Sequence, residues 1–140
     1  MSDKYKVLGK FIKDMSSETP NTETYLFVKE NISKYQLNID IISKAIKDKV
    51  IEINTTLKFE DKNDNERKSY FEIVFATIVK ISDEVKEKKE IEKIVLCEVQ
   101  KEIYPGLEKI LIRTIKDAGF PALKLDKKID FDLLYRQRTN

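Results

Sequence analysis

The sequence predicts an α+β domain in which a four-stranded antiparallel sheet is followed by a long, kinked helix and a short C-terminal helix. Two stretches, 50–60 and 70–81, alternate side chains with a period of two, which indicates β-strands. After Ser82 the apolar residues recur every three or four positions, which is typical of helices. A chain of 140 residues is one ordinary domain. We therefore expect a single domain over residues 1–140, with strands in 1–81 and helices in 83–140.

The two central strands differ in how their faces are patterned. One face of 50–60 is apolar and the other polar, so this strand should have one buried and one wet face. The polar segment 61–66 predicts a hairpin loop. The strand at 70–81 is apolar on both faces, so we expect a helix to cover one face and another subunit the other.

Two more strands are expected upstream. Residues 35–41 alternate clearly, and residues 7–12 form a weaker candidate. Between them, 16–22 forms a polar loop that contains Pro20. Sequential strands joined by short loops favour an antiparallel sheet.

The helical half should begin near Asp83, with Ser82 as its N-cap. Pro105 is expected to break or kink the helix, because proline removes an amide donor and clashes one turn back. Gly119 is the expected C-cap, and Asp130 could cap a last short helix after a loop at 120–128. The apolar stripes lie at Ile91, Ile94, Val95 and Val99, and then at Leu107, Ile110, Leu111 and Ile115.

The composition argues against catalysis. There is no histidine, which removes the commonest general base and the usual metal ligand. Cys97 is the only cysteine and lies among apolar residues, so we expect a buried, inert thiol. We therefore predict no catalytic residues, no metal and no cofactor, and a protein that is not an enzyme.

Charge and hydropathy indicate which partners and which compartment to expect. Lys and Arg total 27 against 25 for Asp and Glu, a net charge of +2, so no nucleic-acid partner is expected. No apolar run approaches the roughly 20 residues of a membrane span, and the N-terminus lacks a signal-peptide pattern. We expect a cytoplasmic protein without direct membrane insertion.

Several apolar residues lie at positions expected to be exposed. The loop that contains Phe120, Leu123 and Leu125 is more apolar than a solvated loop, and Ile103 and Tyr104 precede the expected helix break. These residues either belong to the core and an oligomer interface, or they line a groove for extended peptides. Pattern alone leaves both interpretations open.

Four segments resemble the SecB family of bacterial protein-export chaperones: 11–21 (FIKDMSSETPN), 103–105 (IYP), 117–125 (DAGFPALKL) and 129–135 (IDFDLLY). Their order and spacing cover nearly the whole chain. The resemblance implies an ATP-independent holdase that binds unfolded precursor proteins. It also implies a homotetramer, a dimer of dimers, that delivers its clients to the SecA motor.

The resemblance also implies roles for individual positions. The client-peptide groove would include Leu37 and Ile39 with the loop residues Phe120, Leu123 and Leu125, and we add Ile103 and Tyr104. Subunit interfaces would lie near Phe71, Ile73 and Phe75. Docking of the SecA zinc-binding tail would involve Asp14, Glu18, Tyr70 and Glu72.

The chain departs from the family in its charge. Typical members are strongly acidic, whereas this chain has a net charge of +2 and carries Arg136 and Arg138 near its end. A weaker acidic field should weaken recognition of a cationic tail. The alternative is a SecB-like chaperone dedicated to one partner, such as the antitoxin of a toxin–antitoxin pair.

Overall fold

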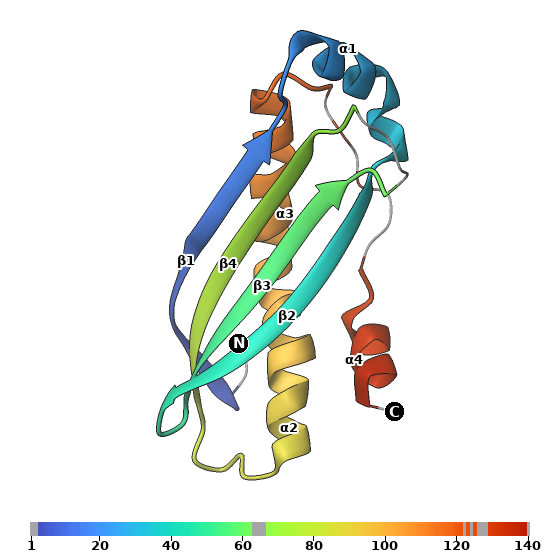
Figure 1. The fold of residues 1–140 in the computed structure, drawn as a ribbon. Helices are drawn as coiled ribbons and strands as arrows, with labels where there is room; N and C mark the ends of the chain where they lie inside the picture. The colour runs from blue at the N-terminus through green and yellow to red at the C-terminus, as the bar shows by residue number, and fades with distance from the viewer. Residues whose placement is uncertain (1–2, 63–66, 122, 124, 126–128, 140) are drawn as a thin grey trace.

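The computed structural model describes residues 3–62, 67–121, 123, 125 and 129–139. One four-stranded antiparallel sheet, in the order β1-β4-β3-β2, lies in front of the long helical segment in Figure 1. The elements are β1 (Tyr5–Glu18), α1 (Thr22–Asn31), a 3-10 turn (Ile32–Lys34), β2 (Gln36–Lys47), β3 (Val50–Glu60), β4 (Tyr70–Ile81), α2 (Lys88–Lys93), a π-helical turn (Ile94–Glu98), α3 (Val99–Asp117) and α4 (Phe131–Thr139).

The expected fold class is confirmed, and β3 and β4 have the predicted bounds. β1 and β2 are longer than predicted. β1 contains register shifts between Val7 and Gly9 and between Ile12 and Asp14. Each shift interrupts the period of two, because a bulge inserts an extra residue into the strand. The alternation therefore looked weak although the strand is the longest of the four.

Helix α1 was not predicted. Its N-cap is Asn21, whose Oδ1 accepts a hydrogen bond of 2.8 Å from the Thr24 amide. Thr24 and Val28 are its buried residues. A helix with so short a buried stripe gives little periodic signal, so the sequence pattern does not predict it.

The hairpin between β2 and β3 turns at Asp48 and Lys49. Lys49 has φ 62°, a left-handed conformation of the kind found in tight hairpin loops. β2 therefore continues to Lys47, six residues beyond the predicted end at Ile41. Residues 42–47 are exposed, which leaves no apolar alternation to mark them as a strand. The predicted loop at 61–66 lies partly outside the described residues.

The helical half begins later than predicted. Ser82 does not cap a helix. Its carbonyl accepts from the Val85 amide and its hydroxyl from the Glu84 amide, so the segment after β4 is a turn and α2 starts at Lys88. Pro105 lies inside α3, which continues without a break to Asp117. A proline ring leaves the fourth preceding carbonyl without its usual donor, and that carbonyl belongs to Lys101, on an exposed residue.

The predicted end of the helix is confirmed at Gly119. This residue has φ +104°, and the Phe120 amide donates to the Ile115 carbonyl, as in a glycine-terminated helix. The Tyr25 ring lies 3.3 Å from where a Cβ on Gly119 would be. A side chain here would be strained by the backbone and crowded by the ring. The predicted loop at 120–128 is described only at residues 120, 121, 123 and 125.

The core lies between the sheet and α3. Odd-numbered residues of β3 and β4 face the helix, and the predicted stripes of the helical half pack against them. One buried polar contact ties the layers together. The Thr55 hydroxyl donates to Gln100 Oε1 at 3.0 Å, and the Gln100 amide donates to the Val95 carbonyl at 3.2 Å. Buried polar groups need such partners, since each unpaired group costs about 1–3 kcal/mol.

The expected subunit interface at Phe71, Ile73 and Phe75 is not supported by the structure. These side chains are on the helix-facing side of β4 and are buried within one chain. They are core residues because α3 covers that face. The opposite face of β4, with Val74, Ala76 and Ile78, points away from α3. A second copy of the chain would therefore have to use other residues.

Candidate functional site

Helix α4 divides the space expected to bind polypeptide. It begins at Phe131 and is capped by Asp130, whose Oδ1 accepts from the Leu133 amide at 3.1 Å, so the predicted cap is confirmed. On one side of α4 lies a cavity of about 310 Å³ against β2, and on the other a cavity of about 450 Å³ against α3. Figure 1 shows α4 beside the β2 edge of the sheet. We call these the β2 cavity and the α3 cavity.

The β2 cavity contains one of the expected groove residues, Ile39, which shares the lining with Ile41. From α4 come Leu134 and Tyr135, and Leu96 completes the apolar wall. Leu37 lies on the same face of β2 and is partly buried against the core.

The α3 cavity brings together two expected groove residues, Tyr104 and Leu125. Ile129 and Phe131 add apolar surface, and the Tyr104 and Phe131 rings meet edge to face with centroids 5.4 Å apart. Burial raises the pKa of the Tyr104 phenol, and the nearby Glu108 carboxylate raises it further. The phenol therefore stays neutral at physiological pH and offers a hydrogen-bond donor in a lining that also carries Lys101, Glu108 and Lys109.

Two of the expected groove residues are structural anchors instead. Ile103 and Phe120 are buried in the core. The Phe120 ring packs between Tyr25 and Phe71, with centroid distances of 5.2 Å and 5.7 Å. Phe120 thus fixes the start of the loop after α3. Leu123, further along this loop, is partly buried against the core.

Residues of α4 and its approach were missed as groove residues. Ile129, Phe131, Leu134 and Tyr135 line one cavity or the other. Their helical spacing predicted a short helix, but not the surface on which it lies. That placement depends on long-range contacts that no local pattern encodes.

Polar contacts hold α4 in place. The Asp132 carboxylate accepts from the Cys97 thiol at 3.1 Å and pairs with the Lys101 ammonium at 2.7 Å. The hydrogen bonds from Lys101 and Cys97 lower the pKa of Asp132. At the other end, Arg138 donates to the Ile41 carbonyl at 3.3 Å and lies 3.9 Å from the Asp40 carboxylate. Exposed pairs of this kind contribute little, roughly 0–1 kcal/mol.

We expect the Cys97 thiol to react slowly with a disulfide reagent. Burial raises its pKa, and the Asp132 carboxylate raises it further, so little thiolate forms at neutral pH. The native chain should react on the order of 100-fold more slowly than the chain unfolded in urea, because access requires local opening. Absorbance of the released thiol measures both rates. Equal rates would contradict a buried thiol.

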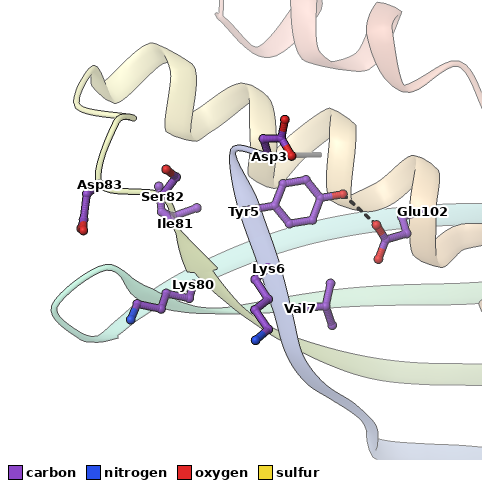
Figure 2. A pocket seen from close by; sticks show the side chains of 9 residues that line it. All are labelled: Asp3, Tyr5, Lys6, Val7, Lys80, Ile81, Ser82, Asp83 and Glu102. Atoms are coloured by element: carbon purple, nitrogen blue, oxygen red, sulfur yellow. Dashed lines mark hydrogen bonds between the residues drawn. The ribbon is translucent and has the colours of Figure 1, made fainter. Parts of the chain in front are cut away.

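A cavity larger than the β2 cavity and the α3 cavity lies elsewhere, at the start of β1. It has a volume of about 580 Å³ and lies between the first residues of β1, the end of β4 and α3 (Figure 2). The Tyr5 hydroxyl donates to Glu102 at 3.0 Å there. Asp3, Lys6, Lys80 and Asp83 also line it, together with the apolar side chains of Val7 and Ile81. It contains no residue of the expected groove.

The expected docking residues come together on one surface. The face of the sheet turned away from α3, hereafter the outer face, carries Asp14, Glu18, Tyr70 and Glu72 near one end. Glu18 lies opposite Tyr70 and Ser16 opposite Glu72. We call Asp14, Glu18 and Glu72 the acidic cluster.

Glu60 was missed as a neighbour of this cluster. It lies opposite Tyr70 on the β3 side, and its carboxylate is 3.6 Å from the Lys58 ammonium. The pairing of 50–60 with 70–81 could have predicted it, because a short hairpin places the end of the first strand opposite the start of the second.

Among the described residues, no group of three or more His, Cys, Asp or Glu side chains could hold a metal ion. Within the same part of the chain, no helix is both long enough and apolar enough to cross a membrane.

A sheet of the order β1-β4-β3-β2, backed by a long helix and flanked by a short one, defines the class of SecB-like chaperone folds. A solved structure of this class, the SecB-like chaperone Rv1957 of Mycobacterium tuberculosis in complex with a ChAD peptide from the Rv1956 HigA1 antitoxin, matches with a TM-score of 0.67. The match covers 91% of this chain and 92% of that one, at 9% sequence identity. The likeness is one of fold.

The chain belongs to the SecB family. The family model described as "Preprotein translocase subunit SecB" matches residues 2–140. A "Putative protein-export protein SecB" of Pelagibacter ubique (strain HTCC1062) is 54% identical over 140 residues, which is 100% of both chains. The "Protein-export protein SecB" of Rhodopseudomonas palustris (strain BisB18) is 31% identical over 133 residues, covering 94% of this chain and 78% of that one. The family resemblance of the sequence is therefore confirmed.

Proposed function

We propose that the chain is an ATP-independent holdase that binds non-native polypeptides around α4, keeps precursors competent for translocation and delivers them to SecA. Membership of the family of protein-export chaperones supports the general activity. The observation that carries the binding site is the pair of mainly apolar cavities on the two sides of α4. Such surfaces bind apolar side chains at roughly 25 cal/mol per Å² with little demand on sequence. The proposal places this activity in the cytoplasm.

The acidic cluster is the proposed docking surface for SecA. It gathers three carboxylates from two strands on one exposed face, and like charges on one surface favour a cationic partner. Lys58 and the net charge of +2 weaken the field, so docking should be weak and salt-sensitive.

The test of the holdase is suppression of aggregation of a reduced, unfolded model protein in the absence of nucleotide. The wild-type chain should suppress light scattering at a several-fold excess. Leu125→Asp should suppress less, about tenfold in the concentration needed, because a charge then lies in the α3 cavity. Leu26→Asp is the matched control, since Leu26 is exposed on α1 and lines neither cavity. Absence of suppression by the wild-type chain would contradict the proposal.

A second candidate is a chaperone dedicated to one partner, such as an antitoxin. Its support is the fold shared with the M. tuberculosis chaperone, whose solved structure contains an antitoxin peptide. Titration with several unrelated unfolded proteins distinguishes the two candidates. Binding of all of them favours the general holdase, and binding of none favours the dedicated chaperone.

We also propose that the chain assembles through the free edge of β1. Within one chain the outer edge of this 14-residue strand pairs with nothing that the structure describes. The strand exposes Leu8, Phe11, Ile12 and Met15 by 50%, 46%, 42% and 43%. A long apolar edge is an aggregation hazard for a monomer, so a closed dimer, or a dimer of dimers, resolves it.

A further inference from the structure

Charges on the outer face are segregated along the strands. The register aligns residues in rows across the sheet, so the position of each outward side chain is known. At the end near the β2–β3 hairpin, Lys6 lies opposite Lys80, and Lys44 lies opposite Glu52. At the other end lie the acidic cluster and Glu60, with Lys58 opposite Glu72.

Among the strand residues at the basic end, Lys6, Lys44 and Lys80 outnumber Glu52, while Asp3 and Asp83 line the neighbouring cavity with Lys6 and Lys80. Lys13 binds Glu52 at 2.7 Å, which places both side chains on this face. Lys13 and Asn54 donate to Glu52 and lower its pKa, and Lys44 lowers it further. Glu52 is therefore ionised and already engaged. Lys6 and Lys80 lie directly opposite one another, and the described part of the chain contains no ion pair with either. Like charges in such pairs repel, so an anionic group placed over them would be stabilising.

Across the residues that the structure describes, the acidic end carries unpaired carboxylates, as the basic end carries unpaired lysines. Asp14, Glu18 and Glu72 have no ion pair among the described residues, whereas Glu60 lies near Lys58. Between the two ends the face is apolar on β1 and β4, where Phe11 lies opposite Ala76 and is flanked by Val74 and Ile78. Lys80 lies eight positions after Glu72 on β4, a distance of about 27 Å at a strand rise of about 3.3–3.4 Å.

We propose that the outer face binds a polypeptide segment whose own charges are segregated, with basic residues over the acidic cluster, apolar residues over Phe11 and Val74, and acidic residues over Lys6 and Lys80. The inference deepens the proposed SecA docking surface and rests on it for the basic part of the partner. A polyanion such as a nucleic acid, or an anionic membrane, could bind the lysines but would be repelled by the acidic cluster about 27 Å away. A purely cationic segment could bind the acidic cluster but would be repelled by the lysines. Only a segment with both charges matches both ends.

The test uses three synthetic peptides of about 12 residues and measures fluorescence anisotropy at low and physiological salt. The first has three lysines, a central apolar stretch and three glutamates. The second has glutamine in place of the glutamates, and the third has the composition of the first with its charges interspersed. The first peptide should bind most tightly, and its affinity should fall as salt rises.

Two double variants and a control separate the ends. The double variant Lys6→Gln, Lys80→Gln should bind the first peptide about threefold to tenfold more weakly at low salt, the loss expected for two exposed ion pairs. Its affinity for the second peptide should rise or stay unchanged. Glu18→Gln with Glu72→Gln should weaken both. Lys29→Gln with Lys34→Gln removes two exposed lysines outside the outer face and should change neither.

The inference is overturned if the first and third peptides bind equally, or if Lys6→Gln with Lys80→Gln leaves binding of the first peptide unchanged. It is also overturned if an anionic vesicle binds the wild-type chain more tightly than the first peptide does. Suppression of aggregation is measured for the same variants and should be unchanged, since the cavities beside α4 are on the other side of the sheet. A chain that binds the first peptide but suppresses no aggregation would refute the holdase and leave this inference standing.

Discussion

Replacing Ile12 and Met15 together by lysine should convert the assembled protein into a monomer of 16.5 kDa. Both side chains project from the helix-facing side of β1 beyond the cover of α3 and are exposed in one chain. Paired edges of two copies would bury them, and an unpaired charge at an interface costs several kcal/mol. Folding of the single chain should be little affected, because the lysine stems can reach solvent.

Light scattering coupled to size exclusion measures this result. The wild-type chain should give a mass of two or four times 16.5 kDa at micromolar concentration. Leu26→Lys is the matched control, since Leu26 is 55% exposed but lies on α1, away from the edge. A wild-type monomer would refute the assembly proposal. An unchanged mass in the double variant would place the interface elsewhere than the β1 edge.

Phe71→Ala should destabilise the fold by about 3–5 kcal/mol, the usual cost of truncating a buried aromatic side chain. Phe71 is fully buried on β4, and its ring meets Phe120 edge to face at 5.7 Å and Phe59 at 6.5 Å. Such a loss is a large part of the roughly 5–15 kcal/mol that stabilises a typical domain. Because Phe120 anchors the loop after α3, the truncation should also loosen the approach to the α3 cavity.

Urea unfolding at a fixed protein concentration measures this effect, with the concentration held constant because assembly adds to stability. Phe11→Ala is the matched control: its ring is half exposed on the outer face, so its truncation should cost less than about 1 kcal/mol. Equal losses for Phe71→Ala and Phe11→Ala would show that the outer face is as well packed as the core.

Local sequence patterns predicted the central strands and the apolar stripes of the helices. Alternation over 50–60 and 70–81 predicted β3 and β4 residue for residue, because each strand has a face that packs on α3. The stripe from Leu107 to Ile115 faces the sheet as predicted, and Gly119 and Asp130 end and begin helices where expected. Local pattern failed at the bulges of β1, at the weakly amphipathic α1 and at the turn after Ser82.

The sequence by itself therefore determined the fold class, the family and the kind of side chain available at each site. Only the tertiary structure decided where these side chains lie. It assigned Phe71, Ile73 and Phe75 to the core rather than to an interface, and it divided the expected groove between two cavities and buried anchors. It also brought Asp14 and Glu72 to one end of the outer face and Lys6 and Lys80 to the other. The reason is physical: periodicity reports which faces of a strand or helix are apolar, whereas the partner of each face depends on strand order and register between residues far apart in the chain.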